Sequence, residues 1–249
     1  MQGSTCAVLT FICVSGVLAS LPLPKYIKPC SRNDPDIDEC AKRHAKDVIS
    51  HPALAQGDSK YKLPPLNPLE IKESIVRDKR MTLTLRDLKI YGLLGAEVDA
   101  IRYDFEKHHM QFLLNFPLVT VLGKYETDGR ILLLPIKGNG NINITDVNLN
   151  VTFDTDYSLQ QIRGKTHMIL ENGKCTVWSG RTYVHLTNLF NGNEVLGAQV
   201  NAFINENWKD FQDAVSPAFA EVIARTITTL VNNMATLVPY DEVFPETVS

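Results

Sequence analysis

The sequence lacks the short motifs by which many enzymes are recognised. It contains no Gly-x-Ser-x-Gly elbow, no His-Glu-x-x-His, no Cys-x-x-Cys, no Gly-x-Gly-x-x-Gly and no phosphate-binding loop. The adjacent histidines His108 and His109 would point to opposite faces of a strand, so they are poorly placed to share a metal ion. We therefore expect a protein that is not an enzyme and needs no cofactor or metal.

The sequence also lacks a strong charge imbalance and a long apolar run. Its 25 basic and 28 acidic residues leave a net charge of −3, which excludes the electrostatic footprint expected for nucleic acid or an anionic membrane. Beyond the N-terminus, no stretch reaches the roughly 18 apolar residues that a membrane helix needs. We expect no nucleic-acid partner and no stable membrane insertion.

The N-terminus has no charged side chain in residues 1–20. Residues 6–18 are mostly apolar, too short to span a bilayer, and are followed by the small residue Ala19. This pattern predicts a secretory signal peptide over residues 1–20, cleaved after Ala19 or one residue later. Residues 21–249 are then expected to form a single extracellular ligand-binding domain.

Cysteine is scarce, with five in the chain, of which Cys6 and Cys13 leave with the predicted signal peptide. In an oxidising compartment, Cys30 and Cys40 are the natural disulfide pair. Closing so short a loop stabilises a fold by roughly 3 kcal/mol on the chain-entropy model. Cys175 is left over, and we expect a buried, unreactive thiol there in preference to a redox or intermolecular role.

A helix is predicted from Ser216 to Val238, with Ser216-Pro217 as its N-terminal cap. At about 100° per residue its apolar side chains cover roughly half of the circumference, and so broad an apolar face is typical of a buried helix. The preceding part of the chain mostly alternates as strands do. We therefore predict an α+β fold in which a highly curved antiparallel sheet wraps this C-terminal helix and leaves an internal apolar tunnel.

The strand patterns indicate how such a sheet curves. Alternation of apolar residues slips by one position near Arg86-Asp87 and again near Thr145-Asp146, and each slip predicts a β-bulge that bends a long strand. The apolar run from Ile131 to Leu134 predicts a strand covered on both faces. Asn172-Gly173, flanked by strand-forming residues, predicts a hairpin turn.

Two N-glycosylation sequons are present, at Asn143-Ile144-Thr145 and Asn150-Val151-Thr152. Seven residues apart in a regular strand they would face opposite sides. The slip between them places both asparagines on the polar face. We therefore predict Asn143 and Asn150 as exposed glycan acceptors.

Several short runs along the chain stand out: Leu23–Cys30 followed by Cys40, Leu83–Gly92, Leu134–Gly140, Leu189–Asn193, Asn205–Trp208 and Val238–Pro245. These runs resemble the takeout and juvenile-hormone-binding protein family of arthropods. The resemblance spans nearly the whole chain after the signal peptide, in the family's order. It implies a secreted haemolymph carrier with a TULIP-type fold, linked to circadian, feeding or chemosensory physiology. Because the hormone-binding branch typically has a second disulfide, the single bridge here favours the takeout branch.

The expected function is to carry a small or elongated hydrophobic ligand, such as a juvenile-hormone-like terpenoid, a fatty acid or a quinone. We expect a monomer, with an unidentified protein receptor as a further partner. The alternative is an extracellular signalling or partner-binding protein whose cavity is only structural. Tyr103, Tyr157 and Tyr183 are candidate hydroxyl donors to a ligand oxygen. The candidate lining residues are Leu83, Leu85, Phe105, Phe112, Leu114, Phe116, Ile142, Ile144, Phe153, Tyr157, Phe219, Val222, Ile223, Ile227 and Met234.

Overall fold

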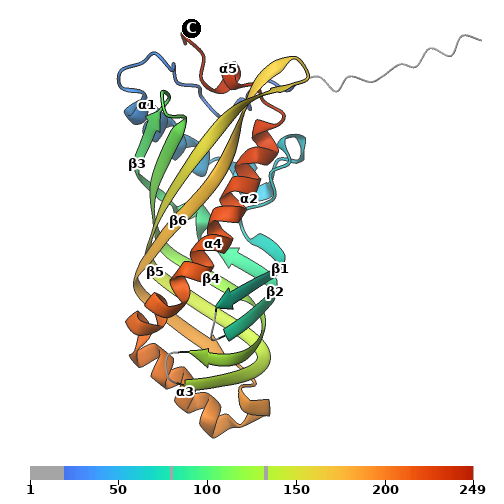
Figure 1. The fold of residues 1–249 in the computed structure, drawn as a ribbon, viewed down its shortest axis with the longest axis vertical. Helices are drawn as coiled ribbons and strands as arrows, with labels where there is room; N and C mark the ends of the chain where they lie inside the picture. The colour runs from blue at the N-terminus through green and yellow to red at the C-terminus, as the bar shows by residue number, and fades with distance from the viewer. Residues whose placement is uncertain (1–19, 79–80, 132–133, 249) are drawn as a thin grey trace, which may run out of the picture.

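The computed structural model describes residues 20–78, 81–131 and 134–248, so the predicted signal peptide lies almost wholly outside the described residues. Figure 1 shows an elongated molecule in which one long helix runs along the concave side of a curved sheet. The strands are β1 (Leu69–Asp78), β2 (Met81–Tyr91), β3 (Glu97–Asp104), β4 (His109–Ile131), β5 (Leu134–Ile162) and β6 (Lys165–Leu186). The helices are α1 (Ile37–Ile49), α2 (Pro52–Gln56), α3 (Glu194–Glu206), α4 (Trp208–Ala235) and α5 (Tyr240–Val243).

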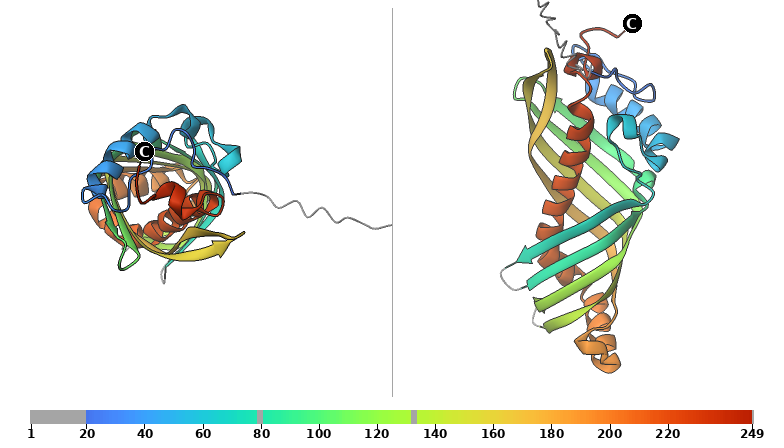
Figure 2. Two further views of the ribbon diagram at one scale, coloured as in Figure 1. Left: turned by 90° about the horizontal axis from the view of Figure 1, so that it is seen from above. Right: turned by 90° about the vertical axis from the view of Figure 1, so that its right-hand side faces the viewer.

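The six strands form one antiparallel sheet in the order β1-β2-β4-β5-β6, and β3 pairs with the part of β4 that β2 does not reach. β4, β5 and β6 contain 23, 29 and 22 residues, so they run the length of the molecule. Seen from above, the sheet curls around α4 (Figure 2). This arrangement confirms the predicted α+β fold with a curved antiparallel sheet around a long C-terminal helix.

Two predicted strand boundaries are wrong. β4 ends at Ile131 and β5 begins at its pairing partner Leu134, so these two residues belong to different strands, and positions 132–133 of the predicted run lie outside the described residues. Asn172-Gly173 is no hairpin, because β6 continues through it. Asn172 has a φ of 55°, opposite the shift in register between β5 and β6. A Cβ on Gly173 would lie 2.5 Å from the Thr228 hydroxyl, so the glycine allows α4 to pass close to the strand.

The bulge predicted in β2 is present. The register between β2 and β4 shifts between Arg86 and Lys89, and Asp87 between them has a φ of 52°. At the second predicted position, Thr145 and Asp146 pair regularly with both neighbouring strands. No register shift occurs there, because the change of phase lies further along β5 and is shared with its neighbours.

We call this shared change the kink line. It consists of three residues that lie opposite one another: Pro117 in β4, Asn148 in β5 and Gly180 in β6. The residues on either side of each are paired with the neighbouring strand, but these three are not paired with one another. The register is the same on both sides of the line, and Asn148 has a φ of 51°. Because all three strands change phase together, the apolar residues stay on the concave face while the sheet bends.

Helix α4 begins at Trp208, eight residues before the predicted cap, and Pro217 lies inside it. Pro217 is exposed, so its missing backbone hydrogen bond falls on the solvent side of the helix. Among the described residues, α4 is the one helix long and apolar enough to cross a membrane. The core helix of a soluble protein passes the same test, and here α4 packs along β6.

The predicted Cys30–Cys40 disulfide is present and fastens the N-terminal segment to α1. Cys175 is a free, half-buried thiol, and burial raises its pKa to about 12. Since the thiolate is the reactive form, this environment supports the unreactive role expected for Cys175.

Candidate ligand-binding site

The interior between α4 and the sheet contains two clusters of closely packed side chains. The lower cluster, beside α3 in Figure 1, consists of Val76, Leu83, Leu85, Leu88, Tyr125, Ile136, Ile142, Ile144, Val184, Leu186, Leu189, Val200, Ile204, Phe211 and Val215. The upper cluster, beside α1 and α5, consists of Cys30, Ile37, Cys40, Met110, Phe153, Tyr157, Met168, Leu170, Ala224, Tyr240 and Phe244.

The predicted lining residues divide between these clusters and half-buried positions outside them. Most belong to a cluster or pack against its edge. Leu114, Phe116, Ile223 and Met234 belong to neither and are half-buried. The buried members are Leu83, Leu85, Ile142 and Ile144 in the lower cluster and Phe153 and Tyr157 in the upper, with Phe219 and Val222 packed against the first and Phe105, Phe112 and Ile227 against the second.

We call the stretch between the clusters the middle zone. Along β4, Leu114 and Phe116 lie between the upper-cluster residue Met110 and the lower-cluster residue Tyr125. Ile223 occupies the matching place on α4, and the zone coincides with the kink line. Apolar side chains left half-buried between two packed clusters retain surface that a ligand can cover.

Two further inward-facing residues, Leu149 of β5 and Val177 of β6, are half-buried near the kink line. Neither residue is among those predicted from the sequence to line the interior. Alternation alone places them on the same face as Phe153, but it does not separate a residue at an open wall from one in a packed core.

An aromatic group closes the upper end of the interior. Phe244 lies 5.2 Å from the ring centroid of Tyr103 and 5.5 Å from that of Phe105, both in edge-on contacts. Phe112 in turn contacts Phe153 at 6.3 Å. Phe105 therefore packs within this aromatic group at the upper end of the interior.

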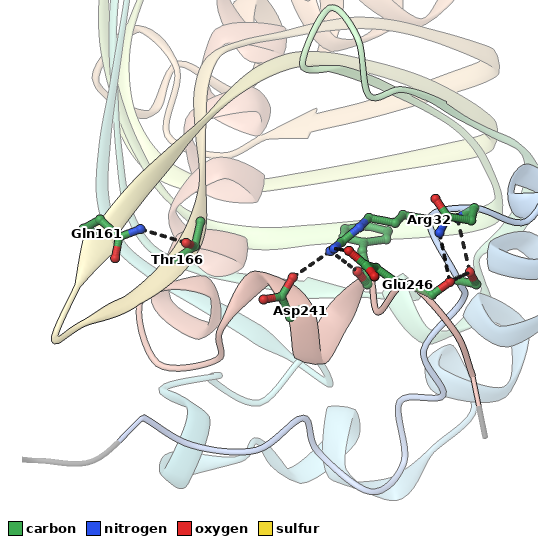
Figure 3. A network of polar contacts seen from close by, with 8 residues as sticks. Arg32, Gln161, Thr166, Asp241 and Glu246 are labelled. Atoms are coloured by element: carbon green, nitrogen blue, oxygen red, sulfur yellow. Dashed lines mark hydrogen bonds and ion pairs between the residues drawn. The ribbon is translucent and has the colours of Figure 1, made fainter.

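The C-terminal segment that carries Phe244 is held by Arg32. The guanidinium pairs with Asp241 at 2.6 Å and with Glu246 at 2.8 Å, and it donates to the Phe244 carbonyl at 2.9 Å (Figure 3). Arg32 also lies over the Tyr240 ring. These contacts join the two ends of the described chain across the top of the interior.

The three tyrosines predicted to orient a ligand have different environments. Tyr183 is half exposed on the outer face, with Arg181 stacked 4.8 Å from its ring centroid, so it does not line the interior. The Tyr157 hydroxyl is hydrogen-bonded to Tyr240, and burial raises its pKa. Burial also raises the pKa of Tyr103. Both inner hydroxyls therefore stay protonated, and that of Tyr157 is already engaged.

The inner wall also carries a cluster of polar side chains that was not predicted from the sequence. Ser179 and Thr182 of β6 are buried, with 1% and 5% exposure. Their hydroxyls donate to the same oxygen, Oδ1 of Asp146, at 2.8 and 2.6 Å. The three residues bracket the kink line, and no local motif could have found them, because 33 and 36 residues separate the partners.

Three asparagines fasten helices α3 and α4 to the free edge of β6. Each side-chain amide donates to the carbonyl and accepts from the N–H of one strand residue, as a neighbouring strand would. The backbone N–H and carbonyl groups of these strand residues are thereby hydrogen-bonded without another strand. The pairs are Asn201 with Leu186, Asn205 with Val184 and Asn232 with Leu170, at 2.7–3.0 Å.

Replacing Asn232 by alanine should lower the free energy of unfolding by about 1–3 kcal/mol, because two buried groups of Leu170 lose their partner. Asn233→Ala is the matched control, since its amide makes a single exposed contact with the Lys62 carbonyl. Denaturant unfolding of both variants measures the difference. An equal loss of unfolding free energy in the two variants would show that the paired hydrogen bonds of Asn232 to β6 add no stability beyond that of an exposed contact.

A metal site is not favoured by the titratable groups. Within the described ranges, Cys30, Cys40 and His44 form the group with suitable ligand spacing. Both sulfur atoms are joined in the disulfide, and the His44 ring lies 3.1 Å from the Lys28 carbonyl. Only one free ligand then remains, too few for a structural zinc site.

A shallow groove of about 360 Å³ lies on the outer face of the sheet. Lys89, Asn143 and His185 line it together with the half-exposed Leu122. These side chains point away from α4, so the groove is separate from the apolar interior.

A curved antiparallel sheet wrapped around one long helix with an apolar interior defines a TULIP-type fold. Residues 6–245 match the family model of haemolymph juvenile hormone binding protein (JHBP), and the chain belongs to this family. The family resemblance inferred from the sequence is therefore confirmed. Members of this family bind small hydrophobic ligands.

Individual relatives agree with this assignment. The chain is 25% identical over 239 residues to the circadian clock-controlled protein daywake of Drosophila melanogaster, covering 91% of this chain and 90% of daywake. It is 22% identical over 223 residues to a putative beta-carotene-binding protein of Schistocerca gregaria, covering 88% of each. The crystal structure of Takeout 1 from Epiphyas postvittana matches with a TM-score of 0.76 at 25% identity, covering 88% of this chain and 100% of Takeout 1.

Proposed function

We propose that this protein is a secreted, non-enzymatic carrier that binds a small or elongated apolar ligand between α4 and the sheet. The observation that carries the proposal is the middle zone, where Leu114, Phe116 and Ile223 are apolar but half-buried. Covering such surface is favourable by about 25 cal/mol per Å² before the costs of association. The name of the Schistocerca gregaria relative, which refers to a carotenoid, supports an apolar cargo.

Solvent extraction and mass spectrometry of the protein purified from its own source test this proposal. A carrier should bring with it one reproducible apolar compound, seen also as a discrete mass increase in native spectra. A protein that is empty, binds no apolar fluorescent probe and retains a tight protein partner would contradict it and favour the signalling alternative.

We also propose that the two sequons differ in glycosylation. Asn143 is exposed, with only a long 3.5 Å contact from the Thr145 hydroxyl. Asn150 is half-buried, accepts from Asn115 at 3.1 Å and donates its own amide to the Asn148 carbonyl at 3.0 Å. A glycan on the Asn150 amide would replace one of its two N–H groups and would need space beside a half-buried side chain that both contacts hold in place.

Peptide mapping after PNGase F treatment of the secreted protein should therefore show conversion to aspartate mainly at Asn143. Asn143→Gln should remove most of the mobility shift, whereas Asn150→Gln should leave it nearly unchanged. Equal conversion at both sites, or conversion mainly at Asn150, would contradict this prediction.

A further inference from the structure

Asp146 places a carboxylate on the inner wall of the sheet. Its pairing partners Val119 and Thr182 are 4% and 5% exposed. Residues directly opposite one another point to the same face of a sheet. Ile144, two positions earlier on β5, belongs to the lower cluster. The Asp146 side chain therefore faces α4, at the junction of the lower cluster and the middle zone.

Only one oxygen of this carboxylate is used. The hydroxyls of Ser179 and Thr182 both donate to Oδ1, and Oδ2 accepts no hydrogen bond from any described residue. No cationic side chain of the described ranges pairs with Asp146. Ser179 and Thr182, which hold the carboxylate, are buried, whereas Asp146 itself is only half-buried. Part of the Asp146 side chain therefore borders open space. A carboxylate in an apolar setting is costly unless a donor satisfies it.

A second polar residue lies on the part of α4 that packs in the lower cluster. Gln212 is 9% exposed, and its amide has no hydrogen-bond partner within the part of the chain that the structure describes. Its helix neighbours Phe211 and Val215 belong to the lower cluster, as does Val184, two residues beyond Thr182 on β6. A carboxylate that needs a donor, on the sheet, and an amide that can donate, on α4, thus both lie beside residues of the lower cluster.

We propose that Asp146 and Gln212 form a subsite for the hydroxyl group of an uncharged apolar ligand, a refinement that rests on the proposed carrier function. A hydroxyl donates to Oδ2 of Asp146 and accepts from the Gln212 amide, which satisfies both groups at once. A fatty-acid carboxylate is repelled by Asp146, and an ester has no proton to donate. The site thereby selects alcohols over acids and esters of equal chain length.

Displacement of the neutral probe N-phenylnaphthylamine by dodecanol, dodecanoate and methyl dodecanoate tests the subsite on the whole secreted protein. Dodecanol should bind at least about tenfold more tightly than the other two, as expected for a hydrogen bond to a charged group. Asp146→Asn removes the charge, so dodecanoate should bind several-fold more tightly while dodecanol weakens. A gain of binding cannot arise from misfolding.

Two further variants complete the test. Asp154→Asn is the matched control on the outer face of β5, where Asp154 accepts from Gln111, and it should leave all three affinities unchanged. Gln212→Leu leaves the Asp146 contacts intact and should weaken dodecanol several-fold. Equal wild-type affinities for the three ligands, or no change of preference in Asp146→Asn, would overturn the subsite while leaving the carrier function standing. A wild-type protein that does not bind the probe at all would overturn both.

Discussion

Replacing Ile223 by tryptophan is expected to lower the affinity for an apolar fluorescent probe at least about tenfold without unfolding the protein. Ile223 lies in the middle zone on α4 and belongs to neither packed cluster. If the zone is open, the indole ring fills space that the ligand would use, and stability changes little. If the zone is closely packed, the larger side chain should instead cost about 1–3 kcal/mol of stability. Probe titration and denaturant unfolding of one variant therefore separate the two cases.

Thr229→Trp provides the control, because Thr229 is exposed on the same helix. It adds an indole to α4 outside the interior, so probe affinity should stay at the wild-type value. Phe219→Trp and Ile227→Trp extend the test toward the lower and upper clusters, and both should also block uptake. Wild-type probe binding in all three interior variants would count decisively against the proposed lining.

Gly92→Ala should destabilise the fold by about 3 kcal/mol or more. Gly92 follows β2 with a φ of 93°, a conformation that costs a residue with a Cβ about 1–2 kcal/mol. The added Cβ would also lie 2.0 Å from the carbonyl oxygen of Leu118, next to the kink line, so strands must move apart. Thermal and denaturant unfolding measure the loss.

Gly95→Ala is the matched comparison, three residues away. A Cβ at Gly95 meets nothing within 4 Å, and its backbone is outside the left-handed region. We expect its stability to stay within about 0.5 kcal/mol of wild type, as for an ordinary surface substitution. A Gly92→Ala protein as stable as Gly95→Ala would show that the end of β2 is not held tightly against β4.

Much of the architecture could be predicted because it rests on local patterns. The bulge at Arg86-Asp87 appears in the sequence as a slip in alternation, and the curved sheet follows from long strands that carry such slips. The breadth of the apolar face of α4 likewise indicated a wrapped helix. The Cys30–Cys40 bridge followed from compartment and spacing.

The errors share one physical cause, which is tertiary context overriding a local signal. Ser216-Pro217 is a good N-terminal cap, yet α4 continues through it, because Pro217 lies on the solvent side. Asn172-Gly173 is a strong turn signal, yet β5 continues to pair beyond it and Gly173 instead makes room for Thr228. Single-sequence patterns do not contain the neighbour that decides such cases.

By itself, the sequence determined the family, the long helix, the curved sheet and the apolar character of the interior, because these depend on periodicity and on short runs of residues. The tertiary structure alone decided which apolar residues are packed and which border the middle zone. It also brought Asp146 to Ser179 and Thr182, 33 and 36 residues away. Those outcomes depend on strand register and on the path of α4 across the sheet, which are set by contacts between distant parts of the chain.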